Sequence, residues 1–274
     1  MAVNLPGPLA ASRLRRFGAA ITKIEPPSGD PLATASPALY RALSTGQQVV
    51  HLNLKQDDGR QRLDDLLHES DLLLTASAPS SLARLGLAWK DLCARYPRLC
   101  QVAIVGNPGA GAERPGHDLT YQASLGLLRP PELPRLLLAD LAGAERAVSE
   151  ALALLLARDR IGAGGYAEVS LTEAGAAFAV PFLHGLTAPG GLLGGGSPVY
   201  NLYPTREGWL AIACIEPQFQ ERLKRALGID QLTHDELERA FGQRTAREWE
   251  AWAQAHDLPL TAVRETVDTL NLHR

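Results

Sequence analysis

The strongest constraint on the fold is the alternation of apolar, strand-like segments with helical segments over the first half of the chain. Strands are predicted at 47–54, 71–77 and 99–105, and helical patterns separate them. Strands separated by helices form parallel β-α-β units. The pattern therefore predicts an α/β fold with an open, mostly parallel Rossmann-like sheet that carries helices on both faces.

The loops that follow these strands are the expected place for a ligand. In open parallel sheets, ligands bind beyond the carboxyl ends of the strands. One such loop follows the strand-like segment 20–25 and is rich in Pro and Gly. Within it, Gly29 is expected to adopt a backbone conformation that other residues avoid.

A glycine-rich stretch at 187–198 divides the chain. It indicates a linker at 187–199 between a large domain, 1–186, and a smaller α+β domain, 200–274. The smaller domain is expected to begin with a β-hairpin that ends at Glu216 and to continue as helices. The same glycines also suit a mobile lid, although a plain connector is the simpler interpretation.

Composition excludes several classes of function. The chain has 274 residues, a formal net charge of -3 and no long run of Lys or Arg, which argues against nucleic acid or an anionic membrane as partner. No apolar run reaches a membrane span and no signal peptide follows Met1, so a cytoplasmic protein is expected. The three cysteines show no C-x-x-C spacing and the histidines are scattered, so no metal is predicted.

The common nucleotide-binding motifs are absent from the sequence. There is no G-x-x-x-x-G-K-[ST], and the glycines at 106–111 do not form G-x-G-x-x-G. No G-x-S-x-G nucleophile elbow is present either. These absences argue against a nucleoside-triphosphate enzyme, a nicotinamide enzyme of the usual kind and a serine hydrolase.

A carboxylate and an imidazole stand before two helix-like segments. Asp140 is predicted to be the N-cap of a long helix, where backbone N–H groups and the helix dipole would favour its ionised form. His117 precedes a second helix, which Asp118 is expected to cap. On residues alone, capping without chemistry is the simpler interpretation. The apolar stripe of the long helix is predicted to contain Leu141, Ala144, Val148, Ala151, Leu152 and Leu155.

The order of segments resembles the family III CoA transferases, a superfamily that includes the α-methylacyl-CoA racemases. No single segment is decisive, but six in the right order are specific. The matching segments are 5–31, 52–67, 82–106, RPGHDLTYQASLGLL at 114–128, ADLAGAERAVSEAL and its continuation at 139–171, and 200–219.

The resemblance implies two alternative chemistries. In the transferases, the aspartate matching Asp140 attacks an acyl-CoA thioester and forms a mixed anhydride. In the racemases, the residues matching His117 and Asp140 lie on opposite sides of the carbon next to the thioester, and a glutamate matching Glu216 supports the histidine. The G-H-D-L-T-Y sequence is similar to the racemase version. Glu216 taken alone would be interpreted as a helix-capping carboxylate.

The resemblance also implies coenzyme A as a substrate moiety and no prosthetic group. Lys55 and Arg84 match positions that contact the nucleotide end of CoA, although either could be an ordinary surface charge. At 76–78, where the family has an aromatic residue and a cation, this sequence has Ala-Ser-Ala. The loop between Leu128 and Asp140 is shorter than usual, so the acyl pocket or the CoA geometry is expected to differ.

Both ends depart from the family pattern. The strand that precedes LPGP is reduced to AVNL, and the returning arm after the small domain is missing. Family members are interlocked dimers, so a homodimer is expected here, but without the threaded ring. Three functions stay open from the sequence: a racemase, a CoA transferase, or a degenerate homologue that binds CoA without turnover.

Overall fold

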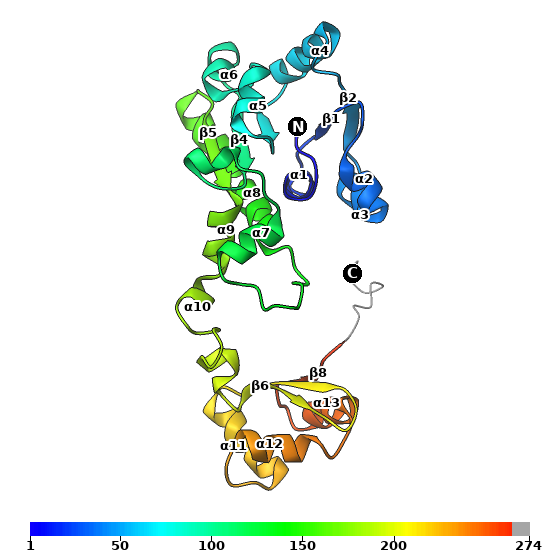
Figure 1. The fold of residues 1–274 in the computed structure, drawn as a ribbon, viewed down its shortest axis with the longest axis vertical. Helices are drawn as coiled ribbons and strands as arrows, with labels where there is room; N and C mark the ends of the chain where they lie inside the picture. The colour runs from blue at the N-terminus through cyan, green and yellow to red at the C-terminus, as the bar shows by residue number, and fades with distance from the viewer. Residues whose placement is uncertain (265–274) are drawn as a thin grey trace. The chain divides into compact units, whose positions relative to one another are not determined.

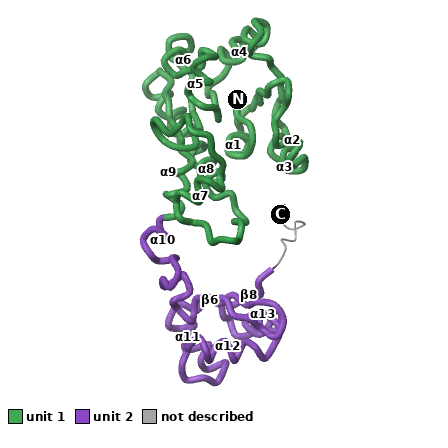
Figure 2. Tube along the Cα trace, viewed as in Figure 1, with its two compact units in different colours: residues 1–179 green, residues 180–274 purple. Residues whose placement is uncertain are grey.

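The computed structural model describes residues 1–264 of the chain. Contacts divide the chain into two compact units, Met1–Ala179 and Val180–Arg274, which Figure 2 distinguishes by colour. Each unit has its own hydrophobic core. The finer domain limits at 186 and 200 stay a prediction.

The first unit confirms the predicted parallel α/β fold (Figure 1). Strand β1 (Thr22–Glu25) pairs in parallel with β2 (Gln48–His51). A second sheet has the order β3-β4-β5, from strands Leu72–Thr75, Cys100–Val105 and Tyr166–Ser170, and all its pairs are parallel. Among the described residues the parallel strands thus form two sheets rather than one.

Helices follow the strands as the alternation predicts. Every residue of β4 is buried, which agrees with a strand covered on both faces. The helices of the first unit are α1 (Pro6–Arg16), α2 (Pro31–Ala35), α3 (Pro37–Ser44), α4 (Asp57–His68), α5 (Pro79–Arg84), α6 (Trp89–Arg95), α7 (Asp118–Ser124), α8 (Leu138–Ile161) and α9 (Leu171–Phe178), with a 3-10 turn η1 (Gly109–Glu113) before α7.

Helix α8 is the central helix of this unit and packs against β4, β5, α1 and α9. The helix was predicted, but its buried face is made of smaller residues than expected. Leu152, predicted in the apolar stripe, is 44% exposed. A Cβ placed on Gly143 would lie 2.2 Å from Cδ2 of Leu171, so small residues allow α8 to approach α9 closely. The buried positions are Ala139, Ala142, Gly143, Ala144, Ala147, Val148 and Ala151.

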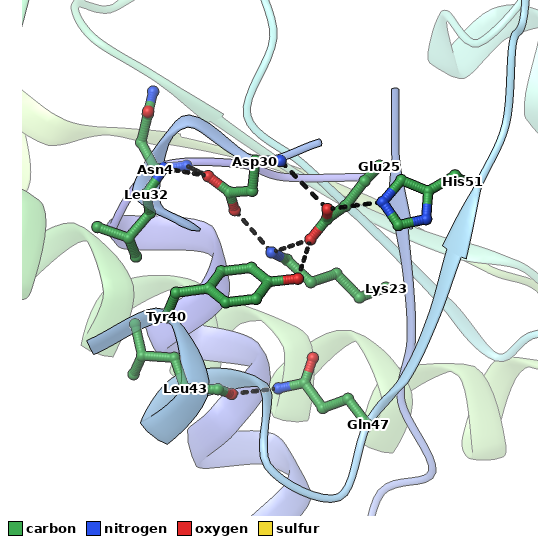
Figure 3. A network of polar contacts seen from close by, with 9 residues as sticks. All are labelled: Asn4, Lys23, Glu25, Asp30, Leu32, Tyr40, Leu43, Gln47 and His51. Carbon is green, nitrogen blue, oxygen red and sulfur yellow. Dashed lines mark hydrogen bonds and ion pairs between the residues drawn. The ribbon is translucent and has the colours of Figure 1, made fainter. Parts of the chain in front are cut away.

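A buried network of charged side chains holds the turn after β1 (Figure 3). Lys23 Nζ lies 2.6 Å from Glu25 Oε1 and 2.6 Å from Asp30 Oδ2, and Tyr40 donates to Glu25 at 2.8 Å. The three charged residues are at most 5% exposed. Gly29 has φ +78, which confirms the special conformation predicted for it. Hydrogen bonds to every charge make this burial tolerable.

Asp30 connects the network to α2. Its Oδ1 accepts hydrogen bonds from the backbone N–H groups of Leu32 (2.9 Å) and Asn4 (3.1 Å). Helices α2 and α3 were not predicted, because prolines that suggest a turn-rich loop occupy the first turn of each helix.

The second unit contains an antiparallel sheet packed with helices. Its strand order is β6-β7-β8, and both pairs are antiparallel. Strands β6 and β7 form the predicted hairpin, whereas β8 was not predicted. The elements are β6 (Tyr200–Pro204), β7 (Trp209–Ala213), β8 (Leu260–Ala262), α10 (Val180–Leu183), α11 (Pro217–Leu227), α12 (His234–Phe241) and α13 (Ala246–Ala255).

The glycine-rich segment 187–199 lies within the second unit and folds back on itself. Backbone N–H groups of Gly191 and Leu193 donate to the carbonyl groups of Ala188 (2.8 Å) and Leu186 (2.9 Å). The segment includes a wide helical turn, η2 (Leu192–Gly196), in which Gly195 has φ +95. Its glycines therefore serve a compact turn.

Candidate active site

His117 is the N-cap residue of α7, and two hydrogen bonds with the Thr120 hydroxyl hold its backbone. Its N–H donates to Thr120 Oγ1 (3.2 Å), and the Thr120 hydroxyl donates to the His117 carbonyl oxygen (2.8 Å). The residue is exposed, so its imidazole is accessible to a bound molecule. A fixed backbone with an accessible imidazole suits proton transfer to a bound molecule.

Asp140 is not the N-cap of α8. The helix begins at Leu138 with Leu137 as N-cap, so Asp140 is its third residue. Its carboxylate is half-buried and accepts no hydrogen bond within the described part of the chain. The prediction that Asp140 caps the helix is therefore wrong.

The sequence predicted that the ionised form of Asp140 is favoured, whereas its environment in the structure favours the protonated form. Burial and, to a smaller extent, the negative charge of Asp118 raise the pKa of Asp140 to about 6, while His117 opposes them. The helix dipole favours the carboxylate, but desolvation outweighs it here. A pKa near 6 leaves Asp140 able to accept and release a proton near neutral pH.

Asp118 caps the neighbouring helix rather than its own. It is only 3% exposed, and it is the first residue of α7 after the N-cap His117. Its Oδ1 accepts the backbone N–H of Asp140 at 3.0 Å. Its Oδ2 accepts Gln122 Nε2 at 2.5 Å. The carboxylate thus ties α7 to the first turn of α8, two helices that pack together (Figure 1).

Two further residues of this region, Tyr121 and Gln122, were not singled out in the sequence. Their signal was helical spacing, since residues three and four positions after Asp118 lie on its side of α7. The ring of Tyr121 packs over two glycines: a Cβ would lie 2.2 Å from its Oη at Gly106 and 2.6 Å from its Cε1 at Gly116. Burial and the charge of Asp140 raise the pKa of Tyr121.

Lys55 and Arg84 belong to the same unit and follow β2 and end α5 respectively. Neither forms an ion pair with any described residue. Arg84 donates to Ser81 Oγ at 2.9 Å. Their charges therefore stay available for an anionic ligand.

A cavity of about 250 Å³ is lined by Leu54 and Leu85, the chain neighbours of Lys55 and Arg84, but by neither cation itself. Its other lining side chains are apolar or basic, apart from Asp64 and Tyr96. Burial, with a hydrogen bond to Asp64, raises the pKa of Tyr96 to about 12, so the phenol stays protonated. The remaining lining residues are Arg60, Leu63, Leu67, Leu87 and Arg95.

Glu216 lies in the second unit, where it is the N-cap residue of α11. Its side chain is exposed and makes no hydrogen bond to the described residues, so it is not acting as a side-chain cap. Its backbone carbonyl accepts from the N–H groups of Phe219 and Gln220 at 3.0 and 3.1 Å. The predicted support of His117 by Glu216 stays a prediction.

Residues 1–264 hold neither a metal-binding cluster of side chains nor a membrane-spanning helix. No group of three or more His, Cys, Asp or Glu side chains in that range is placed to hold a metal ion. Across the same residues, no helix combines the length and the apolarity needed to cross a membrane.

An imidazole and a carboxylate of raised pKa thus stand at the starts of two packed helices, and both are residue types that acid/base and nucleophilic chemistry use. The family model described as CoA-transferase family III matches residues 1–274. The chain belongs to this family, as its order of segments predicts.

Named relatives in this family carry out both types of reaction. The chain is 31% identical over 283 residues to the α-methylacyl-CoA racemase of Homo sapiens, covering 92% of this chain and 72% of the relative. It is 27% identical over 323 residues to the cinnamoyl-CoA:phenyllactate CoA-transferase of Clostridium sporogenes, covering 98% and 78%. The relatives do not distinguish the two chemistries.

The fold also matches solved structures. A crystal structure of a hypothetical protein from Mycobacterium tuberculosis superposes with a TM-score of 0.84 at 24% identity, covering 97% of this chain and 82% of the other. At this identity the likeness concerns the fold alone.

Proposed function

We propose that the protein acts on an acyl-CoA thioester and transfers a proton at the carbon next to the thioester, with His117 and Asp140 as the two acid/base groups. The observation that carries this proposal is the placement of both side chains at the starts of α7 and α8, close enough for the charge of His117 to act on the pKa of Asp140.

Two different groups suit inversion of a carbon centre. One removes the proton from one face, and the other returns a proton to the opposite face. The intermediate enolate carries negative charge, which the positive end of α8 would favour. In this proposal Lys55 and Arg84 bind the anionic nucleotide end of CoA.

The first experiment incubates the protein with a 2-methylacyl-CoA in deuterated water. Mass spectrometry of the thioester should find deuterium at the α carbon without any added carboxylic acid. The double variant His117→Ala/Asp140→Asn should take up none. Uptake by that double variant would remove both residues from the mechanism.

The CoA sites have a separate test. Lys55→Ala and Arg84→Ala should raise KM for the acyl-CoA about tenfold each and change kcat little, because each removes a charged contact of roughly 1.4 kcal/mol. Lys90→Ala, which removes an exposed cation from α6, is the control. Equal KM values for all variants would place the nucleotide elsewhere.

A CoA transferase is the second candidate function, favoured by the Asp140 carboxylate, which accepts no hydrogen bond from the described residues. Its carboxylate oxygen would attack the thioester carbonyl, form a mixed anhydride and expel CoA thiolate. Hydroxylamine would then convert the Asp140 anhydride into a hydroxamate that mass spectrometry detects. This chemistry requires an acceptor acid, and His117→Ala should leave it largely intact.

We also infer a homodimer. Apolar side chains of the first unit are strongly exposed in the single chain, with Leu152, Leu156 and Phe178 at 44, 57 and 60%. Such a surface is typical of an interface. Light scattering coupled to size-exclusion chromatography should give twice the 29.4 kDa chain mass, and a monomeric mass would contradict the inference.

A further inference from the structure

Gln122 is a buried amide with two hydrogen bonds and no part in the chemistry proposed above. It is 4% exposed. Its Nε2 donates to Oδ2 of Asp118 at 2.5 Å and to the carbonyl oxygen of Leu136 at 2.8 Å. Leu136 belongs to the short segment that leads into α8. One amide group therefore holds both Asp118 and the entry to the helix that carries Asp140.

The partner of this amide is a buried carboxylate that no cation neutralises. Asp118 forms no ion pair with any residue of the described range. Its two oxygens are instead satisfied by neutral donors, the Gln122 amide and the Asp140 backbone N–H. A carboxylate in such a position depends on its hydrogen bonds, because burial without them is costly.

The pair controls the surroundings of Asp140 in two ways. The hydrogen bond from the Asp140 N–H fixes the backbone of that residue against α7. The charge of Asp118 acts on the Asp140 carboxyl and contributes to its raised pKa. Both effects depend on how Asp118 is oriented, and the Gln122 amide is one of the two donors that hold its carboxylate.

We propose that Gln122 is a positioning residue for the Asp140 acid/base group, holding Asp118 against the first turn of α8 so that the placement and charge environment of Asp140 are fixed. This inference rests on the proposed role of Asp140 in proton transfer. It assigns Gln122 a function that would otherwise be taken for simple packing between α7 and the segment before α8.

The informative variant is Gln122→Met, which keeps length and apolar bulk but removes the amide donor. Asp118 then loses one of its two donors, so it becomes easier to protonate or free to turn away. Either change weakens its repulsion of the Asp140 carboxylate. The pKa of Asp140 should fall by roughly one unit.

The matched control is Gln101→Met. Gln101 is also a buried amide, 1% exposed, and its Nε2 donates to the Leu87 carbonyl oxygen at 3.2 Å. The Gln101→Met variant shows whether the loss of any buried amide is enough to change the pKa of Asp140. Gln122→Glu is the second variant, because it keeps the shape of the side chain but places a carboxylate beside Asp118, and it should raise the pKa of Asp140.

The measurement is a carbon-13 NMR titration of the Asp140 carboxyl carbon without substrate, assigned by its loss in Asp140→Asn. The expected result is a downward shift in Gln122→Met, an upward shift in Gln122→Glu and the wild-type midpoint in Gln101→Met. Wild-type midpoints in both Gln122 variants would overturn the inference.

Activity supplies an independent readout. The rate of deuterium exchange falls on the acidic side of its pH profile, and the midpoint of this fall should shift with the NMR midpoint in each variant. If the wild type exchanges no deuterium, the proposed proton transfer fails, while the NMR titration still decides the role of Gln122. If the NMR midpoint moves but the acidic side of the pH profile of deuterium exchange does not, the link between Gln122 and catalysis is overturned.

Discussion

The backbone N–H of Asp140 donates a 3.0 Å hydrogen bond to Oδ1 of Asp118. Asp118→Asn keeps an oxygen acceptor but removes the negative charge that raises the pKa of Asp140. That pKa should fall from about 6 by roughly one unit, and the acidic limb of activity should move with it. The pH dependence of deuterium exchange measures the change.

The control for this prediction is Glu145→Gln, which neutralises an exposed carboxylate farther along α8 that pairs with Arg13 at 3.0 Å. Its charge is well solvated, so the acidic limb should stay in place. An equal shift in both variants would mean that net charge, and not the contact with Asp118, sets the pKa of Asp140.

Ionised Asp140 should lower the stability of the fold. Because folding raises its pKa from 3.8 to about 6, the carboxylate form is less favourable in the native state. The penalty is absent below the unfolded pKa, grows as the pH rises between these two values and is complete above the folded one. Asp140→Asn should therefore stabilise the protein at pH 7, by up to about 3 kcal/mol.

Urea denaturation at pH 4 and pH 7 tests this prediction. The gain of Asp140→Asn should shrink to roughly 0.5 kcal/mol at pH 4, just above the unfolded pKa. Asp159→Asn, an exposed position near the end of α8, should change the free energy of unfolding little at either pH. A pH-independent gain would exclude ionisation as its cause.

The long-range capping of α8 explains why the candidate site was only partly predictable. The choice of His117 and Asp140 came from resemblance and from their place near helix starts. The cap itself could not be predicted, because Asp118 precedes Asp140 by 22 residues and only folding brings them together. The raised pKa of Asp140 depends on burial, which local helix rules do not describe.

The fold followed more closely from the sequence. The strand at 99–105 was predicted from its apolar run and is β4. Helices α2 and α3 were missed because Pro31 and Pro37 indicate turns as well as helix starts. Strand β8 was missed because its three residues are too few to show an alternation.

The buried network around Lys23 should contribute strongly to stability. Lys23→Met would leave the carboxylates of Glu25 and Asp30 buried without a cation, which costs roughly 3–5 kcal/mol. Arg13→Met breaks the exposed pair with Glu145 and should cost less than about 1 kcal/mol. Similar losses in both variants, by urea denaturation, would contradict the assignment of a structural role to the network.

The network also predicts a direction of pH dependence. Despite burial, which opposes it, the hydrogen bond from Lys23 lowers the pKa of Glu25. The stabilising contribution of Glu25 is therefore present above its unfolded pKa and is lost as the pH falls through the folded value. Glu25→Gln should remove this acid-dependent loss. An unchanged acid transition in Glu25→Gln would assign that loss to other carboxylates.

Gly106 should not tolerate a side chain. A Cβ there would lie 2.2 Å from the Tyr121 hydroxyl oxygen, so Gly106→Ala must displace the ring beside Asp140. The loss of stability should be roughly 1–3 kcal/mol. Tyr121→Phe removes the nearest clashing atom, so the double variant should recover part of the loss. Additive losses in the double variant would mean that the alanine clashes elsewhere.

The most direct test of the central claim uses the two enantiomers of a 2-methylacyl-CoA separately in deuterated water, with mass spectrometry of the α carbon. The wild type should take up deuterium from both. His117→Ala and Asp140→Asn should each keep uptake from one enantiomer only, and the retained enantiomer should differ between the two variants, because each remaining group serves one face of the carbon. Two results would contradict two-base proton transfer. In the first, both variants still take up deuterium from both enantiomers. In the second, the wild type takes up no deuterium but exchanges CoA when an acceptor acid is present.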